Sequence, residues 1–212
     1  MNRGNWLVSA AFLLLIGTLA VRASEVLPQD PGPKTQDPPQ GRAGEYLGSA
    51  ACARCHDVEH TQWKNSLHIK MTKPVTEATI VGDFRDGTRF ADHDRAFTFG
   101  RKDGKPFVRV SFGGRSAETF TVDYTLGAKR YQGYLSMLPE GRIYVLPVFW
   151  HIASKRWVDW KEITPIPEGA HDIRQIWNAN CFNCHGTNIV QGYDLDEKKY
   201  RSTWTEMGIG CE

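Results

Sequence analysis

The sequence predicts an α+β fold in which two short helical or loop segments flank an inserted, small antiparallel β-sheet. Two cysteine-containing motifs, at residues 52–56 and 181–185, lie near opposite ends of the chain. Between them, several short runs alternate apolar and polar side chains, which is the pattern of half-buried strands. An apolar run and then a proline-rich stretch precede the first motif. We therefore divide the chain into residues 1–23, 24–44 and 45–212.

Residues 1–23 have the parts of a secretory signal peptide. Arg3 supplies the positive charge, residues 7–21 are almost wholly apolar, and Ala23 ends a cleavage pattern of small residues. The alternative is an uncleaved anchor helix, although the apolar run is short for a membrane span. We expect a periplasmic or otherwise exported protein that has no membrane span after the signal peptide is cleaved.

Residues 24–44 are predicted to form a disordered linker. Five prolines alternate there with Gln, Asp, Gly and Lys residues. A segment of this composition has too few apolar side chains to form a core, and its prolines favour an extended chain. We therefore expect the folded part of the protein to begin near residue 45.

Two copies of the pattern C-x-x-C-H carry the chemistry of this sequence. Residues 52–56 read C-A-R-C-H, and residues 181–185 read C-F-N-C-H. In a helical turn, residues i, i+3 and i+4 share one side. Two cysteine sulfurs can then form thioethers with one porphyrin while the histidine coordinates its iron, which is the attachment signature of haem c. The predicted attachment residues are Cys52, Cys55, Cys181 and Cys184, and the predicted proximal iron ligands are His56 and His185.

The cysteine pairs have three alternative interpretations. One Cys₄ zinc site could use both pairs, but it leaves the histidine after each pair unexplained. A thioredoxin-like redox pair needs a βαβ setting, and the sequence predicts none. Structural disulfides are compatible with export. We favour two haem c groups, because the two motifs use four of only five cysteines and each ends in histidine.

The remaining histidines are candidates for distal iron ligands. We predict a helix from residue 58 to about residue 70, on which His68 lies about 120° from His56. His68 is then badly placed for the iron of its own haem and well placed for that of another, so we predict it as a distal ligand. His171, ten residues before Cys181, is a further distal candidate. The weaker candidates are Met71, His93 and His151.

Residues 78–162 are predicted to form the β insert, flanked by haem segments at residues 45–77 and 163–212. The insert contains five or six expected strands, at residues 96–99, 107–112, 119–126, 131–138, 142–149 and 157–160. Turn residues fall between them, as at 102–105, which read K-D-G-K. The aromatic side chains of this region are expected to pack in the core and against haem.

The charge balance excludes one class of partner. The chain has 26 Lys and Arg against 24 Asp and Glu, a net charge of +2, and no basic stripe that would indicate nucleic-acid binding. The sequence also shows no acid–base pair, no phosphate-binding loop and no second metal motif. We therefore expect redox chemistry at haem, with other redox proteins as electron donor and acceptor.

Four segments together resemble a known family. They read Y-L-G-S-A-A-C-A-R-C-H at residues 46–56, R-Y-Q-G-Y-L-S-M-L-P-E-G-R-I-Y-V-L-P-V-F-W at 130–150, W-N-A-N-C-F-N-C-H-G-T-N at 177–188 and T-W-T-E-M-G-I-G-C-E at 203–212. The chain is similar to multihaem c-type cytochromes with a cytochrome c-552/4 (c-554-like) domain, many of which continue into tetratricopeptide repeats. The resemblance implies an exported electron carrier with closely spaced haems. It also matches His68 to a histidine that recurs after the first motif.

Cys211 is left over once the two motifs are assigned. Relatives in the resembled family continue after a terminal G-C-E with A-C-H-G, which completes a third attachment motif. We therefore expect Cys211 to begin a third haem site and the sequence to be a C-terminally truncated product. A free or intermolecular thiol is the alternative.

The leading functional expectation is electron transfer. One alternative is a haem enzyme that acts on a small nitrogen oxide or peroxide, which would need an iron with an open coordination position. A second alternative is a haem-bearing interaction or sensor module. Carbon monoxide binding separates the carrier from the enzyme, because it reports an open position on iron.

Overall fold

The computed structural model describes residues 46–92, 94–113, 115–164 and 175–212. The predicted signal peptide and linker, and the ligand candidates His93 and His171, lie outside the described residues. Among the helices of the described part, none has the length and apolar character needed to cross a membrane.

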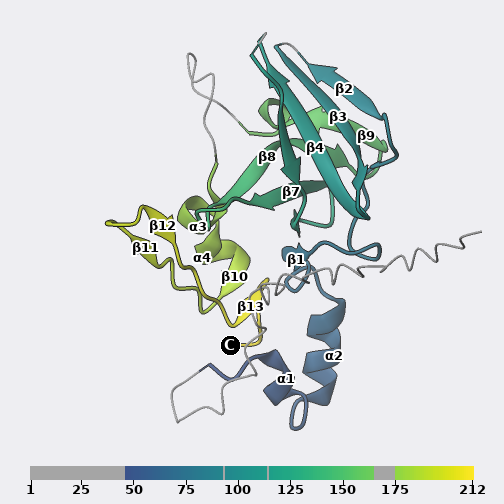
Figure 1. Cartoon of the computed structure of the whole chain (residues 1–212). Helices are drawn as coiled ribbons and strands as arrows, with labels where there is room; N and C mark the ends of the chain where they lie inside the picture. The colour runs from purple at the N-terminus through teal and green to yellow at the C-terminus, as the bar shows by residue number, and fades with distance from the viewer. Residues whose placement is uncertain (1–45, 93, 114, 165–174) are drawn as a thin grey trace, which may run out of the picture. The chain divides into compact units, whose positions relative to one another are not determined.

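Nine antiparallel strands form two sheets, where the sequence predicted one sheet of five or six strands. The larger sheet has the order β1(Thr72–Pro74), β6(Tyr124–Leu126), β7(Tyr131–Met137), β8(Ile143–His151) and β9(Arg156–Asp159). The smaller sheet has the order β2(Arg89–Asp92), β3(Arg95–Lys102), β4(Lys105–Phe112) and β5(Glu118–Thr121). Figure 1 shows both sheets in the part of the chain coloured teal to green.

The β3–β4 hairpin forms where the turn residues predicted it. Lys102 pairs with Lys105 across a two-residue loop. Asp103 and Gly104 have φ angles of 52° and 77°, and two successive positive φ angles match the twist of the flanking strands. Along both strands, buried apolar residues alternate with more exposed ones, so this hairpin turns one apolar face toward the core.

The strand predicted at residues 119–126 is divided between the two sheets. Its first half pairs with β4 and its second half pairs with β7. The chain crosses at Val122 and Asp123, whose backbone N–H groups donate to the carbonyl oxygens of Pro106 and Leu135, 2.9 Å and 2.8 Å away. The Asp123 carboxylate also accepts from Met137 N at 2.8 Å. These long-range bonds hold the crossing in place.

The two sheets share one aromatic core. Phe99 of β3 stacks on Trp157 of β9 with ring centroids 3.8 Å apart. The ring of Phe84 packs edge-on against Phe99, Trp157 and Tyr134. Because these rings come from both sheets and are buried, burial of their apolar surface holds the sheets face to face.

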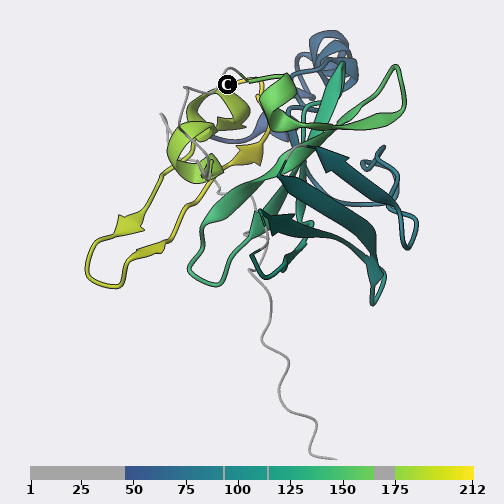
Figure 2. The same cartoon turned by 90° about the horizontal axis from the view of Figure 1, so that it is seen from above.

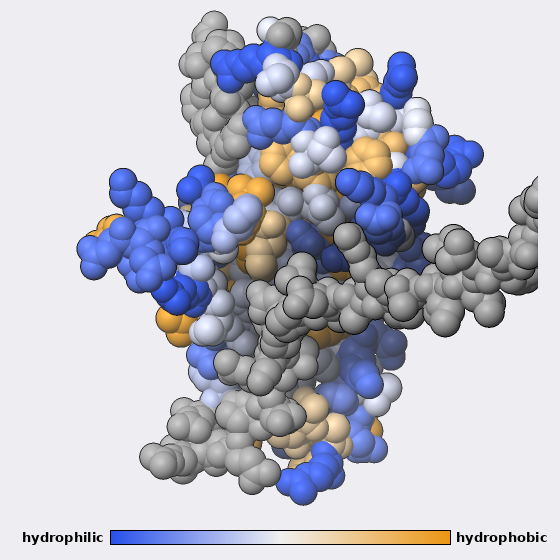
Figure 3. Space-filling view, in the orientation of Figure 1, coloured by the Kyte–Doolittle hydropathy of each residue, from blue (hydrophilic) through white to orange (hydrophobic). Residues whose placement is uncertain are grey.

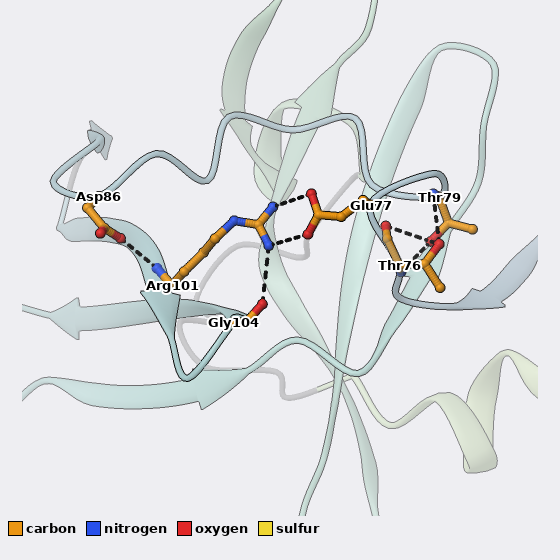
Figure 4. A network of polar contacts seen from close by, with 6 residues as sticks. All are labelled: Thr76, Glu77, Thr79, Asp86, Arg101 and Gly104. Carbon is orange, nitrogen blue, oxygen red and sulfur yellow. Dashed lines mark hydrogen bonds and ion pairs between the residues drawn. The ribbon is translucent and has the colours of Figure 1, made fainter.

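A surface network joins the segment before β2 to the β3–β4 hairpin (Figure 4). Both terminal nitrogens of Arg101 donate to the Glu77 carboxylate, at 2.6 Å and 3.1 Å. The Arg101 backbone N–H donates to Asp86 Oδ1 at 2.7 Å. The bidentate pairing fixes the relative orientation of the Arg101 guanidinium and the Glu77 carboxylate. It therefore anchors the segment that leads from the first motif into the sheets.

Short helices and strands carry the two cysteine motifs outside the sheets. The first motif begins at the last residue of α1(Ser49–Cys52) and ends directly before α2(Asp57–Asn65). The second motif begins at Cys181, which lies between α3(Trp177–Asn180) and α4(Phe182–His185), and ends with α4. The chain then continues through β10(Gly186–Thr187), β11(Tyr193–Asp194), β12(Lys199–Tyr200) and β13(Glu206–Met207). Both views place α3, α4 and the β11–β12 hairpin to one side of the sheets (Figure 1, Figure 2).

The helix predicted at residues 58–70 is shorter than expected. It ends at Asn65, and Ser66 is extended with ψ of 171°. The Ser66 hydroxyl accepts from the His68 backbone N–H at 3.2 Å, which is a serine side chain competing with helical hydrogen bonding. Leu67 and His68 therefore lie beyond the helix, and the helical-phase argument for His68 is wrong.

Candidate functional site

Both cysteine motifs are closed by the same two backbone hydrogen bonds. In the first motif, the N–H groups of Cys55 and His56 donate to Cys52 O at 3.2 Å and 2.9 Å. In the second motif, the N–H groups of Cys184 and His185 donate to Cys181 O at 3.2 Å and 3.1 Å. Each motif is thus a single helical turn. This is the conformation that we assumed when we predicted that the two cysteines and the histidine of C-x-x-C-H share one side.

The first motif lies at the surface between two helices. Cys52 is half-buried, whereas Cys55 and His56 are exposed. His56 precedes the first residue of α2, and its carbonyl oxygen accepts from His60 N at 2.8 Å. The helix therefore fixes the backbone of His56 and leaves its imidazole free to act as a ligand.

The second motif is anchored on the larger sheet by the residues just before it. Trp177 and Asn178 are fully buried. The Asn178 side chain accepts from Ile143 N at 3.1 Å and donates to Gly141 O at 2.9 Å. Because Asn178 bonds the turn residue Gly141 and the first residue of β8, the turn that carries Cys181 has a fixed position relative to the sheet.

The C-terminal segment, residues 206–212, links the two motifs. The Glu206 carboxylate accepts from the backbone N–H and the hydroxyl of Ser49, at 3.2 Å and 2.6 Å. The backbone N–H of Gly208 donates to His185 O at 3.1 Å. Thr187, directly after the second motif, donates its hydroxyl to Gly208 O at 2.9 Å. One short segment thus holds both motifs.

Strand β1 adds a second link between the motifs. Thr72 is fully buried, and its hydroxyl donates to His185 O at 3.0 Å. The carbonyl oxygen of His185 therefore accepts from two segments, one that follows the first motif and one at the C-terminal end. The contacts of Glu206 with Ser49 and of Thr72 with His185 were not predicted from the sequence, because they join residues more than a hundred positions apart.

His68 lies next to the same C-terminal segment. Its carbonyl oxygen accepts from Ile209 N at 3.1 Å, and the Trp63 indole donates to Ile209 O at 2.8 Å. The His68 side chain is exposed, with Nδ1 lying 3.4 Å from the Ser66 hydroxyl. Residues 208 and 209 therefore contact both His68 and His185, which places the distal candidate near the second motif.

The electrostatic environment keeps His185 in the form that binds metal. Burial lowers the pKa of His185 from its ordinary value of 6.5, so its imidazole is neutral at neutral pH. Its Nδ1 has no hydrogen-bond partner among the described residues. A neutral imidazole with an uncommitted ring nitrogen fits the role of an iron ligand.

The donor set and its surroundings fit covalent haem. Each motif offers two free thiols and one imidazole. Val58 and Leu67, which follow the first motif, are 58% and 42% exposed. A porphyrin is a flat, largely apolar group that can cover such side chains. Figure 3 shows apolar patches among hydrophilic residues in the region of α1 and α2.

The zinc interpretation finds no support in the geometry. All four motif cysteines are described, yet no group of three or more His, Cys, Asp or Glu residues in the described part could hold a metal ion. The two cysteine pairs therefore do not combine into one Cys₄ site. All five cysteines are free thiols.

Comparison with known proteins gives one finding. Residues 51–85 match the family described as cytochrome c554 and c-prime. The matched segment contains the first motif and His68 and ends before the second motif, and it supports a c-type cytochrome domain with covalently bound haem and a role in electron transfer. Neither the curated proteins nor the solved structures gave a match.

Proposed function

We propose that this chain is an exported electron carrier with two covalently bound c-type haems. The observation that carries the proposal is the identical backbone turn of the two C-x-x-C-H motifs, each with two free thiols and a terminal histidine. The family match over the first motif supports the same chemistry. The signal-peptide pattern of residues 1–23 supports export.

The chain's residues have two tasks in this proposal. Cys52, Cys55, Cys181 and Cys184 form the thioethers, and His56 and His185 are the proximal iron ligands. Haem iron supplies the chemistry by cycling between two oxidation states, with a potential set by axial ligands and burial. Residues 206–210 hold both motifs at a fixed separation, which keeps the path between two redox centres constant. Protein partners then act as donor and acceptor.

We expect the intact mass of the purified protein to exceed that of the polypeptide by about two haems. The haem stain should survive denaturing electrophoresis, because thioether bonds are not broken by detergent. Replacing both cysteines of one motif by serine should remove one haem and leave the other. A protein that contains zinc and no haem would contradict the proposal.

We also expect His68 to be a distal ligand to iron. Its contacts with Ile209 and Met71 use the backbone carbonyl oxygen, so His68→Ala should leave the fold intact. The variant should gain a haem that binds carbon monoxide and should lose part of the low-spin spectrum. His60→Ala is the matched control, because His60 packs on Trp63 with ring centroids 5.2 Å apart and is not a predicted ligand. A spectrum unchanged by His68→Ala would rule out this assignment.

The third haem site at Cys211 stays a prediction. The described residues place Cys211 beside the first motif, with its backbone N–H donating to the Ser49 hydroxyl at 2.8 Å. Measuring haem per polypeptide tests this site directly, because a third haem would add to the two at the complete motifs.

A further inference from the structure

Cys211 lies against the first motif although it is far away in sequence. Its backbone N–H donates to the hydroxyl of Ser49, 162 positions earlier. The carboxylate of Glu212 accepts from the N–H groups of Leu47 and Gly48, at 2.9 Å and 3.1 Å. These three hydrogen bonds fix the C-terminal segment beside the start of α1.

This arrangement brings two thiols together. Ser49 and Cys52 are the first and last residues of α1, one helical turn apart, so their side chains share one side of the turn. The thiol of Cys211 is a close neighbour of the thiol of Cys52. Cys181 has its own motif partner Cys184 as its thiol neighbour. The first motif thus has a third thiol beside it, that of Cys211. The second motif has only its own two thiols and serves as the comparison within the same chain.

We propose that Cys52 and Cys211 form a disulfide when the haem-free chain is oxidised, and that this bond blocks haem attachment at the first motif. The block rests on the proposed function, since it assumes that Cys52 forms a thioether. The disulfide itself does not, because it needs only the two neighbouring thiols. Reduction of this bond would return Cys52 to the free thiol that attachment requires.

The oxidant in this reaction is a small-molecule disulfide such as oxidised glutathione. Cys211 is exposed and Cys52 is half-buried, so the Cys211 thiolate attacks one sulfur of the oxidant and releases the first small thiol. The Cys52 thiolate then attacks the Cys211 sulfur of the mixed disulfide and releases the second small thiol. The two protein thiols lose two protons and two electrons, which leave on the two small thiols.

Peptide mapping of the oxidised, haem-free full-length chain tests the disulfide. The probe is oxidised glutathione, applied with and without denaturant, followed by blocking of the remaining thiols. In denaturant, loop-closure entropy favours pairing within each motif. Without denaturant, the peptide linking Cys52 to Cys211 should be enriched by about tenfold or more. A folded sample that gives mainly Cys52–Cys55, a reduced Cys211, or the same mixture as in denaturant overturns the proposal.

The variant Cys211→Ser tests the block, because it keeps the backbone hydrogen bond to Ser49. After loading with haem under oxidising conditions, the first motif of the wild-type chain should carry less haem than the second. In Cys211→Ser, haem at the first motif should rise to the level of the second. Equal loading of both motifs in the wild-type chain would overturn the block. Absence of haem from both motifs would overturn the proposed function, while the mapping still decides the disulfide.

Discussion

Replacing His185 by alanine is expected to raise the number of carbon monoxide-binding haems by about one per chain. The change removes the proximal ligand of the second haem, so its iron gains an open position and loses its low-spin character. The backbone of residue 185 keeps its bonds to Cys181, Thr72 and Gly208, so the turn itself should persist. The measurement is carbon monoxide titration of the reduced protein, followed by its absorption spectrum.

Two further samples make the His185→Ala result specific. Added imidazole should restore the low-spin spectrum, because it supplies the missing ligand without changing the fold. His60→Ala is the control, since His60 packs on Trp63 with ring centroids 5.2 Å apart and is not a predicted ligand. If His60→Ala and His185→Ala gave the same spectra, His185 would not be an iron ligand.

The helical turn of each motif could be predicted because it is local in sequence. Each motif places its thiols and imidazole within five consecutive residues, and a single helical turn is enough to align them. The β3–β4 hairpin is local in the same sense, since the Asp103-Gly104 turn sets its register. The spacing of residues and the residue types of a turn determine structure over only a few positions. Structure of that range can be predicted from the sequence pattern.

Long-range contacts explain what the sequence did not predict. The alternation at residues 119–126 continues across a change of sheet, because both halves have a buried face. The end of α2 depends on one serine hydroxyl, which outweighs a helical pattern that continues to residue 70. The link between the motifs through Glu206 and Gly208 has no local signature. Such pairings follow from tertiary packing, which overrides local preference.

A buried ion pair in the β-sheet region has a large expected effect on stability. The side chains of Arg95 and Asp159 are 3% and 1% exposed, and Arg95 Nη2 lies 3.1 Å from Asp159 Oδ1. The geometry leaves Arg95 Nη2 and Asp159 Oδ2 without a hydrogen-bond partner among the described residues. Asp159 Oδ1 also accepts from Lys161 N at 2.9 Å. Burial raises the pKa of Asp159, while the Lys161 backbone bond and Arg95 lower it.

Arg95→Met is expected to lower the free energy of unfolding by about 3–5 kcal/mol near neutral pH, because it leaves a buried carboxylate without its counter-charge. The folded-state pKa of Asp159 is already above its ordinary value of 3.8, and losing Arg95 raises it further. Above about pH 4, the folded state then binds more protons than the unfolded state, so stability falls as pH rises. The loss should therefore be smaller near pH 4 than near pH 7.

Denaturant unfolding of three variants at both pH values tests this prediction. Arg95→Met/Asp159→Asn should recover most of the stability and lose the pH dependence, because the amide oxygen of the asparagine can still accept from Lys161 N and carries no charge. Arg156→Met is the surface control, since Arg156 and Glu162 are 54% and 39% exposed and solvent screening leaves such pairs little effect on stability. An Arg95→Met loss no larger than that of Arg156→Met, or one that grows as pH falls, would show that Arg95 does not neutralise Asp159.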